Sequence, residues 1–184
     1  EELVARFSSP GYRSSREHLF GIYARGRKNL GMTRMTFMPG DPDRDGGAFV
    51  GVMDLEMNVF GATWHGREIT HFDKNFGMLA NAFVEDRGNG TETTTIVIEN
   101  GERVLRRVGQ EIDERYVHPF LGADHHSRMS LVALASILRA SDSLPILLQG
   151  ISWPKRARVG EEPKLLNHWI VYQGTRPYDW RGQT

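Results

Sequence analysis

Residues 93–108 read TTTIVIENGERVLRRV and predict a β-hairpin. Residues 93–98 are all β-branched, and such residues favour strands. Asn100-Gly101 follows as the strongest two-residue turn signal, because both residues readily adopt a positive φ. Residues 104–108 then provide the returning strand. The hairpin indicates that antiparallel sheet is a main element of the fold.

Alternating patterns on the N-terminal side extend this sheet. Met35 and Phe37 share one face of a short predicted strand. Residues 61–73 predict another strand, while residues 75–85 fit either a short helix or a bulged strand. Between the strand at Met35 and Phe37 and the strand at residues 61–73, the sequence predicts a longer strand. One face of it would carry Phe49, Met53, Leu55, Met57 and Val59, and the other face Asp54, Glu56 and Asn58.

Two helices and two further strands complete the prediction. Apolar residues follow Ser127 at helical spacing and predict one long helix over about residues 127–140. Residues 14–23 predict a short N-terminal helix, with Ser14 or Ser15 as its cap. Residues 144–151 and 165–172 are typical of strands.

Together these elements predict an α+β fold. About seven short strands would form a curved antiparallel sheet or a barrel-like β structure around a cavity, packed against the long helix. Strands and helices do not alternate as they do in a parallel doubly wound sheet, so that class is not expected. With 184 residues, the chain is expected to form a single domain over residues 1–184.

The composition limits the classes of partner and the compartment that we expect for the protein. Lys and Arg number 23, as do Asp and Glu, so the zero net charge argues against a nucleic-acid or membrane partner. No apolar stretch reaches the length of a membrane span, and the acidic start Glu1-Glu2 is unlike a signal peptide. The chain has no cysteine, which fits a reducing compartment. We expect a cytoplasmic protein, compatible with a homodimer formed through an apolar patch.

The first candidate site is His71-Phe72-Asp73, preceded by His65. If residues 61–73 form an unbroken strand, all three polar side chains project from one face. A carboxylate two residues from an imidazole suits acid–base catalysis, with His71 as the catalytic group and Asp73 as the group that orients it. The simpler alternative is a His–Asp hydrogen bond on a solvated sheet face.

A second candidate site directly precedes the long helix. The positive end of that helix would favour a neutral imidazole, as a base or a metal ligand requires. In the alternative interpretation, Asp124 or Ser127 caps the helix and the histidines are simply exposed. The cluster consists of Tyr116, His118, Asp124, His125 and His126.

His168 lies in a segment, LLNHWIVY, whose two strand faces are both apolar. A half-buried histidine of this kind commonly bonds to the backbone. Together with His71 and Asp73, however, it resembles the facial triad of non-haem iron oxygenases. That resemblance implies an iron-dependent oxygenase as the alternative enzyme class, with Arg176 as a clamp for a substrate carboxylate.

We expect a small-molecule-binding enzyme of the isomerase, cyclase or lyase type that needs no cofactor. Seven Met, nine Phe and four Trp would line a cavity for a mainly apolar substrate. The alternatives are a non-catalytic carrier or sensor, a protein-interaction module and a metal-dependent enzyme. The expected substrate-binding residues are Trp64, His65, Tyr116 and His168. If a metal ion is bound, the expected ligands come from His71, Asp73, His118, His125, His126 and His168.

Overall fold

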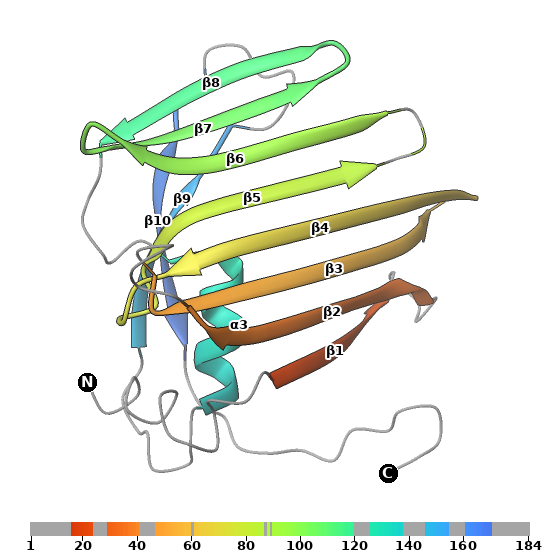
Figure 1. Ribbon diagram of the computed structural model, residues 1–184, viewed down its shortest axis with the longest axis horizontal. Helices are drawn as coiled ribbons and strands as arrows, with labels where there is room; N and C mark the ends of the chain where they lie inside the picture. Colours follow the sequence, from red (N-terminus) through yellow and green to blue (C-terminus); the bar gives the residue numbers. More distant parts are fainter. Residues whose placement is uncertain are drawn as a thin grey trace.

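One open antiparallel sheet forms most of the described chain. The computed structural model describes residues 16–23, 29–40, 47–59, 61–86, 88, 90–119, 126–137, 146–154 and 161–170. Eight strands pair in sequence order, each with the next along the chain, and form a curved meander (Figure 1). They are β1 Arg16–Tyr23, β2 Asn29–Pro39, β3 Phe49–Val59, β4 Ala62–Phe72, β5 Met78–Asp86, β6 Thr91–Glu99, β7 Glu102–Gly109 and β8 Ile112–Pro119.

The sheet does not close into a barrel. Within the described residues β1 pairs only with β2 and β8 only with β7, so the two strands form its two edges. The barrel-like alternative is therefore wrong, and the curved open sheet is the observed form.

The predicted N-terminal helix is also wrong. Residues 16–23 form β1, which pairs with β2 from Arg16 opposite Phe37 to Tyr23 opposite Asn29. A short helix is marginal by itself, and Gly21 would weaken it further. The free edge of β2 instead provides backbone hydrogen bonds along the whole segment.

The hairpin from which the prediction started is confirmed. Asn100 and Gly101 connect β6 and β7 with φ values of 53° and 80°. Two consecutive residues with positive φ are what a type I′ turn requires. The next strand, β8, was not predicted. Its segment was interpreted as part of a polar cluster in front of the helix.

Two smaller elements cover one face of the sheet. The helix α3, Arg128–Ile137, has ten residues in place of the long helix expected over 127–140, and residues 138–140 lie outside the described part. The strands β9, Ile146–Ser152, and β10, Lys164–Ile170, lie where strands were expected. They form a separate antiparallel pair, which was not predicted. None of the described helices is long and apolar enough to cross a membrane.

The core lies between the sheet and these covering elements. In Figure 1, α3 and the β9–β10 pair lie behind the sheet. Side chains of α3 and β9 pack on apolar residues of β2, β3 and β4. A second cluster joins Met78, Ile96 and Leu105 of β5, β6 and β7, with Tyr116 and Trp153 packed against it. We call the face that carries Met35, Met53 and Glu68 the inner face, and the opposite one, with Arg34, Asp54 and Arg67, the outer face.

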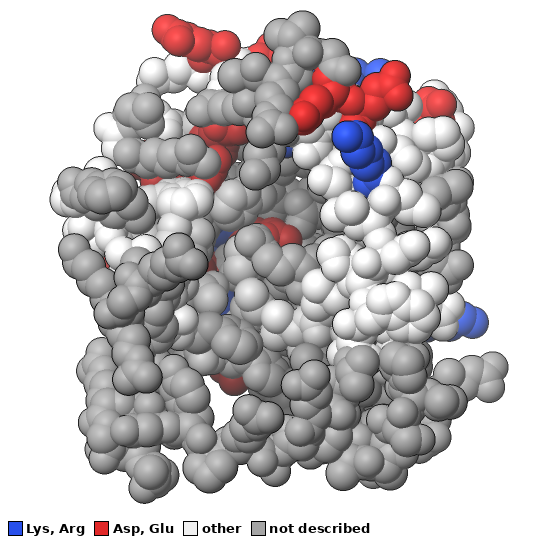
Figure 2. All heavy atoms as spheres, turned by 180° about the vertical axis from the view of Figure 1, so that it is seen from behind, with Lys and Arg blue, Asp and Glu red and all other residues white. Residues whose placement is uncertain are grey.

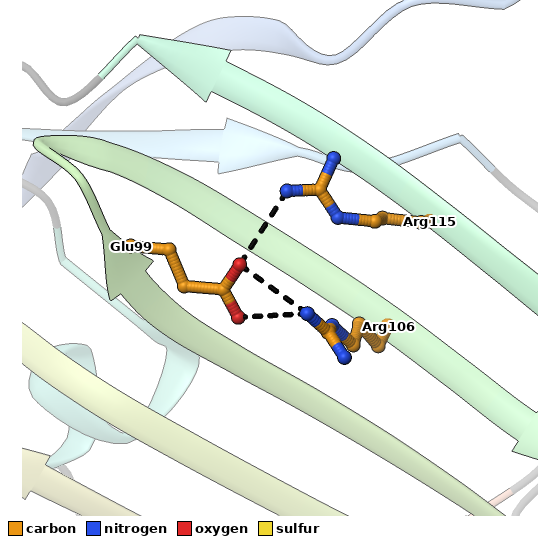
Figure 3. Close-up of polar contacts among 3 residues, drawn as sticks. All are labelled: Glu99, Arg106 and Arg115. Atoms are coloured by element: carbon orange, nitrogen blue, oxygen red, sulfur yellow. Dashed lines mark hydrogen bonds and ion pairs between the residues drawn. The ribbon is translucent and has the colours of Figure 1, made fainter.

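The outer face carries solvated ion pairs. Glu99 on β6 contacts Arg106 on β7 at 3.1 Å and Arg115 on β8 at 3.4 Å (Figure 3). Arg34 and Glu17 form a further pair across β2 and β1 at 3.1 Å. Exposed pairs of this kind contribute about 0–1 kcal/mol each, so they mark the solvent side of the sheet more than they stabilise it.

Candidate functional site

A cavity of about 330 Å³ lies between the inner face and the covering elements. We call it the central cavity. On the sheet side it is lined by Glu68, Met78, Asn81 and Ile96. On the covering side its walls include His126, Leu131, Gly150, Trp153 and His168. The volume is at the lower end of the range for small-molecule sites.

A buried polar network lies on the sheet side of this cavity. The side-chain amide of Asn81 donates to Glu68 Oε1 and to Thr70 Oγ1, each at 2.8 Å. The Thr70 hydroxyl lies 3.3 Å from the same Glu68 oxygen. Strand register explains the contact, because Thr70 and Asn81 lie opposite each other on β4 and β5, and Glu68 is two residues along the same face. Glu68 as a residue is 6% exposed.

Two half-buried histidines belong to the covering side. The backbone amide of His126 donates to Gln149 O at 2.6 Å, which attaches the segment before α3 to β9. A Cβ at Gly150 would lie 3.1 Å from His126 O and 3.6 Å from His168 Nε2. The missing side chain at Gly150 therefore leaves room for the His168 ring in the cavity wall.

The turn between β4 and β5 attaches α3 to the sheet. Asp73 Oδ1 accepts hydrogen bonds from the backbone amides of Asn75, at 2.7 Å, and Gly77, at 2.9 Å. Phe76 in this turn has a φ of 62°, and its carbonyl accepts a bond from Ser130 Oγ at 3.0 Å. The turn therefore fixes the first residues of α3, beside His126.

Arg103 supports the start of β5 at Met78. It is fully buried, and its Nη1 donates to Met78 O at 2.6 Å. Burial lowers the pKa of Arg103 to about 10, while the negative charge of Asp73 acts in the opposite direction. Asp73 therefore accepts hydrogen bonds from the turn and also places a negative charge near Arg103.

The structure separates the residues of the first predicted site. Strand β4 ends at Phe72, with an irregularity between His71 and Phe72, so Asp73 lies in the turn and not in the strand. His65 and His71 share the outer face, as expected from their spacing. His71 Nδ1 is buried without a hydrogen-bond partner among the described residues. The catalytic role of His71 and Asp73 stays a prediction.

The remaining predicted residues lie in several places. Tyr116 packs beside the central cavity, against Met78 and its neighbours, with the Arg107 guanidinium 5.9 Å from its ring centre. Trp64 is four residues from Glu68 on β4, about 13 Å along the strand, and is not a lining residue. His118 Nδ1 lies 2.8 Å from Pro119 O on the edge strand β8. His125 and Asp124 lie outside the described residues.

The described residues do not assemble the facial triad. His71 projects from the outer face, whereas His168 lines the central cavity on the inner side. In the described part of the chain, no group of three His, Asp or Glu side chains could hold a metal ion. Arg176 lies outside the described ranges.

Sequence reasoning missed Glu68, Thr70, Asn81 and Trp153. One signal was present, since Glu68 and Thr70 alternate with outward residues and share a face with the apolar Phe72. A carboxylate on a buried strand face is unusual enough to mark a site. The chain matches no protein-family model, no curated protein and no solved structure.

Proposed function

We propose that the protein binds a small, mainly apolar molecule in the central cavity and transfers a proton on it. Glu68 holds the polar end of the molecule, and His168 is the acid–base group, with His126 beside it. One observation carries this proposal: a fixed, buried carboxylate and two half-buried imidazoles line the same cavity. The reaction class is that of an isomerase, cyclase or lyase, which needs proton movement at carbon.

The environment of Glu68 suits an anchor. A buried carboxylate is costly unless hydrogen bonds compensate it, and here Asn81 and Thr70 bond to one of its oxygens. These bonds fix the orientation of the carboxylate before a ligand arrives, which lowers the entropic cost of binding.

The histidines suit the transfer step. Imidazole changes its charge near neutral pH, so it can accept a proton from a ligand carbon and return it to another atom. Met78, Ile96 and Trp153 supply apolar walls that keep water from competing with this transfer.

A non-catalytic carrier or sensor is the second candidate. It is favoured by the same hydrogen bonds, because a carboxylate fixed by Asn81 could simply select a ligand. This alternative predicts binding that survives the loss of every histidine.

Isotope exchange tests the proposal without knowledge of the product. A library of small aromatic and alicyclic compounds is screened by NMR for shifts at cavity residues, and each binder is then incubated with the protein in D₂O. We expect deuterium to enter at carbon in at least one bound compound. His168→Asn should slow this exchange by about 100-fold, the lower range for one acid–base group, and leave binding intact.

The controls separate the alternatives. His65→Asn changes an exposed histidine of the outer face, outside the central cavity, and should not affect exchange. A loss of exchange in this variant would instead favour the substrate-binding role expected for His65 from the sequence. His71→Asn and Asp73→Asn test the site predicted from the sequence. If the compounds bind in the central cavity and no deuterium enters any of them, the protein is a carrier. If no compound shifts a cavity residue, the binding proposal itself fails.

A further inference from the structure

We infer that the central cavity selects ligands that carry an uncharged O–H or N–H group on a small apolar body, and that Asn81 Oδ1 accepts the hydrogen bond from this group. The inference rests on the proposed binding function and specifies the chemical class of the ligand. Asn81 then determines specificity, at the same end of the cavity as Glu68.

Both donor hydrogens of the Asn81 amide are used within the protein. Nδ2 donates to Glu68 Oε1 and to Thr70 Oγ1, each at 2.8 Å. The Thr70 hydroxyl donates to Glu68 Oε1 or to Met129 Sδ, both at 3.3 Å, so its oxygen is the acceptor of the Asn81 bond. Because both partners of the nitrogen are acceptors, the amide has one orientation, with the carbonyl oxygen Oδ1 directed away from them.

The carbonyl oxygen of Asn81 is an acceptor that the fold does not use. Oδ1 makes no hydrogen bond to any of the described residues. Asn81 is 8% exposed and lines the central cavity, and Oδ1 itself is not sealed in the core. Acceptors of buried residues are normally paired in a folded protein. A ligand in the cavity that offers a donor hydrogen supplies this pairing.

The position of Oδ1 is fixed before a ligand arrives. Asn81 lies in the middle of the sheet, opposite Thr70 on β4 and Ile96 on β6, and its two donated bonds hold the side chain. A ligand with a donor therefore binds without the cost of ordering this group. A ligand of the same shape without a donor leaves the acceptor unpaired, which is how a polar group in a cavity excludes such analogues.

The walls define the body of the ligand. Met78, Ile96, Leu131 and Ile151 are apolar, and Trp153 offers an aromatic face. The volume of about 330 Å³ suits a compound with one or two rings. The amide oxygen has no formal charge, so it compensates the burial of a neutral donor but not the larger desolvation cost of an ion.

The side of the molecule that carries the covering elements is hollowed. Figure 2, viewed from behind the sheet, shows this hollow, and many of the described side chains around it are uncharged (white). Uncharged surroundings suit a neutral ligand. Small aromatic alcohols and indole-like compounds meet all of these requirements.

The experiment compares two pairs of probes that differ only in the donor group. The first pair is 2-naphthol and 2-fluoronaphthalene, and the second is indole and indene. Dissociation constants are measured by NMR titration of the full chain at pH 7. We expect the donor member of each pair to bind about tenfold more tightly, as one hydrogen bond to an otherwise unpaired acceptor allows. The Asn81 Cγ resonance should move downfield with 2-naphthol and indole only.

Matched variants make the test specific. Asn81→Leu keeps the approximate shape of the side chain and removes its carbonyl, so the members of each pair should bind within about twofold of each other. Asn167→Leu makes the same change at an exposed position of β10 and should leave the preference unchanged. The comparison of probes and the Cγ shift on the unchanged protein also hold if Asn81→Leu does not fold.

The outcomes distinguish the two proposals. If 2-fluoronaphthalene and indene bind in the cavity as tightly as their donor counterparts, the inference is overturned and the proposed binding function stands. A donor preference that persists in Asn81→Leu also overturns it, because another group then accepts the bond. Absence of binding by 2-naphthol and indole overturns the inference as well, and the compound screen then decides the proposed function separately.

Discussion

Asp73 illustrates, at the residue scale, how one carboxylate can suit two interpretations. In the sequence it follows His71 at the spacing of an orienting acid. In the structure its Oδ1 accepts two backbone amides of the β4–β5 turn, and its charge acts on buried Arg103. Spacing alone cannot separate these roles, because the strand ends one residue before Asp73.

Substitution of Asp73 tests its structural role. Asp73→Ala removes both acceptor contacts and should lower the free energy of unfolding by about 1–3 kcal/mol in urea denaturation. Asp73→Asn keeps an oxygen that can accept the same bonds, so its loss should be smaller. Equal losses for the two variants would assign the effect to the charge beside Arg103 instead.

Some residues of the central cavity could be identified from the sequence, and others could not. Histidines 126 and 168 attract notice in a chain with seven histidines. Glu68 and Asn81 do not, because they meet only through the pairing of β4 with β5. The start of β5 was ambiguous between helix and strand, so the register that joins the two residues could not be derived.

At the scale of elements, strands with one apolar face were predictable. On β3, Met53 is buried while Asp54, Glu56 and Asn58 are exposed, as the alternation indicates. The edge strands β1 and β8 were missed because solvent on one side leaves them few apolar residues in strict alternation. These segments form strands because they pair with β2 and β7, and their own sequences do not reveal that pairing.

Ser130 links α3 to the sheet and offers a test at this scale. It is fully buried, accepts a bond from the Ser127 amide at 3.0 Å and donates to Phe76 O. Ser130→Ala leaves both groups without this partner, so we expect a loss of about 1–3 kcal/mol and faster hydrogen exchange in α3. The exposed Ser152→Ala is the control. Equal exchange rates in both variants would contradict the anchoring role.

At the scale of the whole molecule, we expect the charge balance to influence how copies of the chain associate. The chain has no net charge at neutral pH, so long-range repulsion between copies is absent. Apolar side chains are exposed on the β9–β10 pair, among them Trp169 at 63%. The homodimer expected from the sequence stays a prediction.

Solubility should therefore be lowest near pH 7. At pH 5 the chain, which has no net charge near pH 7, carries a positive charge, and copies then repel one another. Precipitation by polyethylene glycol at pH 5, 7 and 9 measures this directly. A maximum of solubility at pH 7 would show that charge does not control association.

The meander also determines the order in which the parts become available during synthesis. All eight strands of the sheet precede the elements described as covering it, and the 51 residues from 120 through 170 are added after Pro119. At roughly 5–20 residues per second, the ribosome needs about 3–10 seconds to add them. During that interval α3 and the β9–β10 pair, the described elements that cover the inner face, have not yet been made. We therefore expect a nascent chain of this topology to be most prone to aggregation at one defined point of its synthesis.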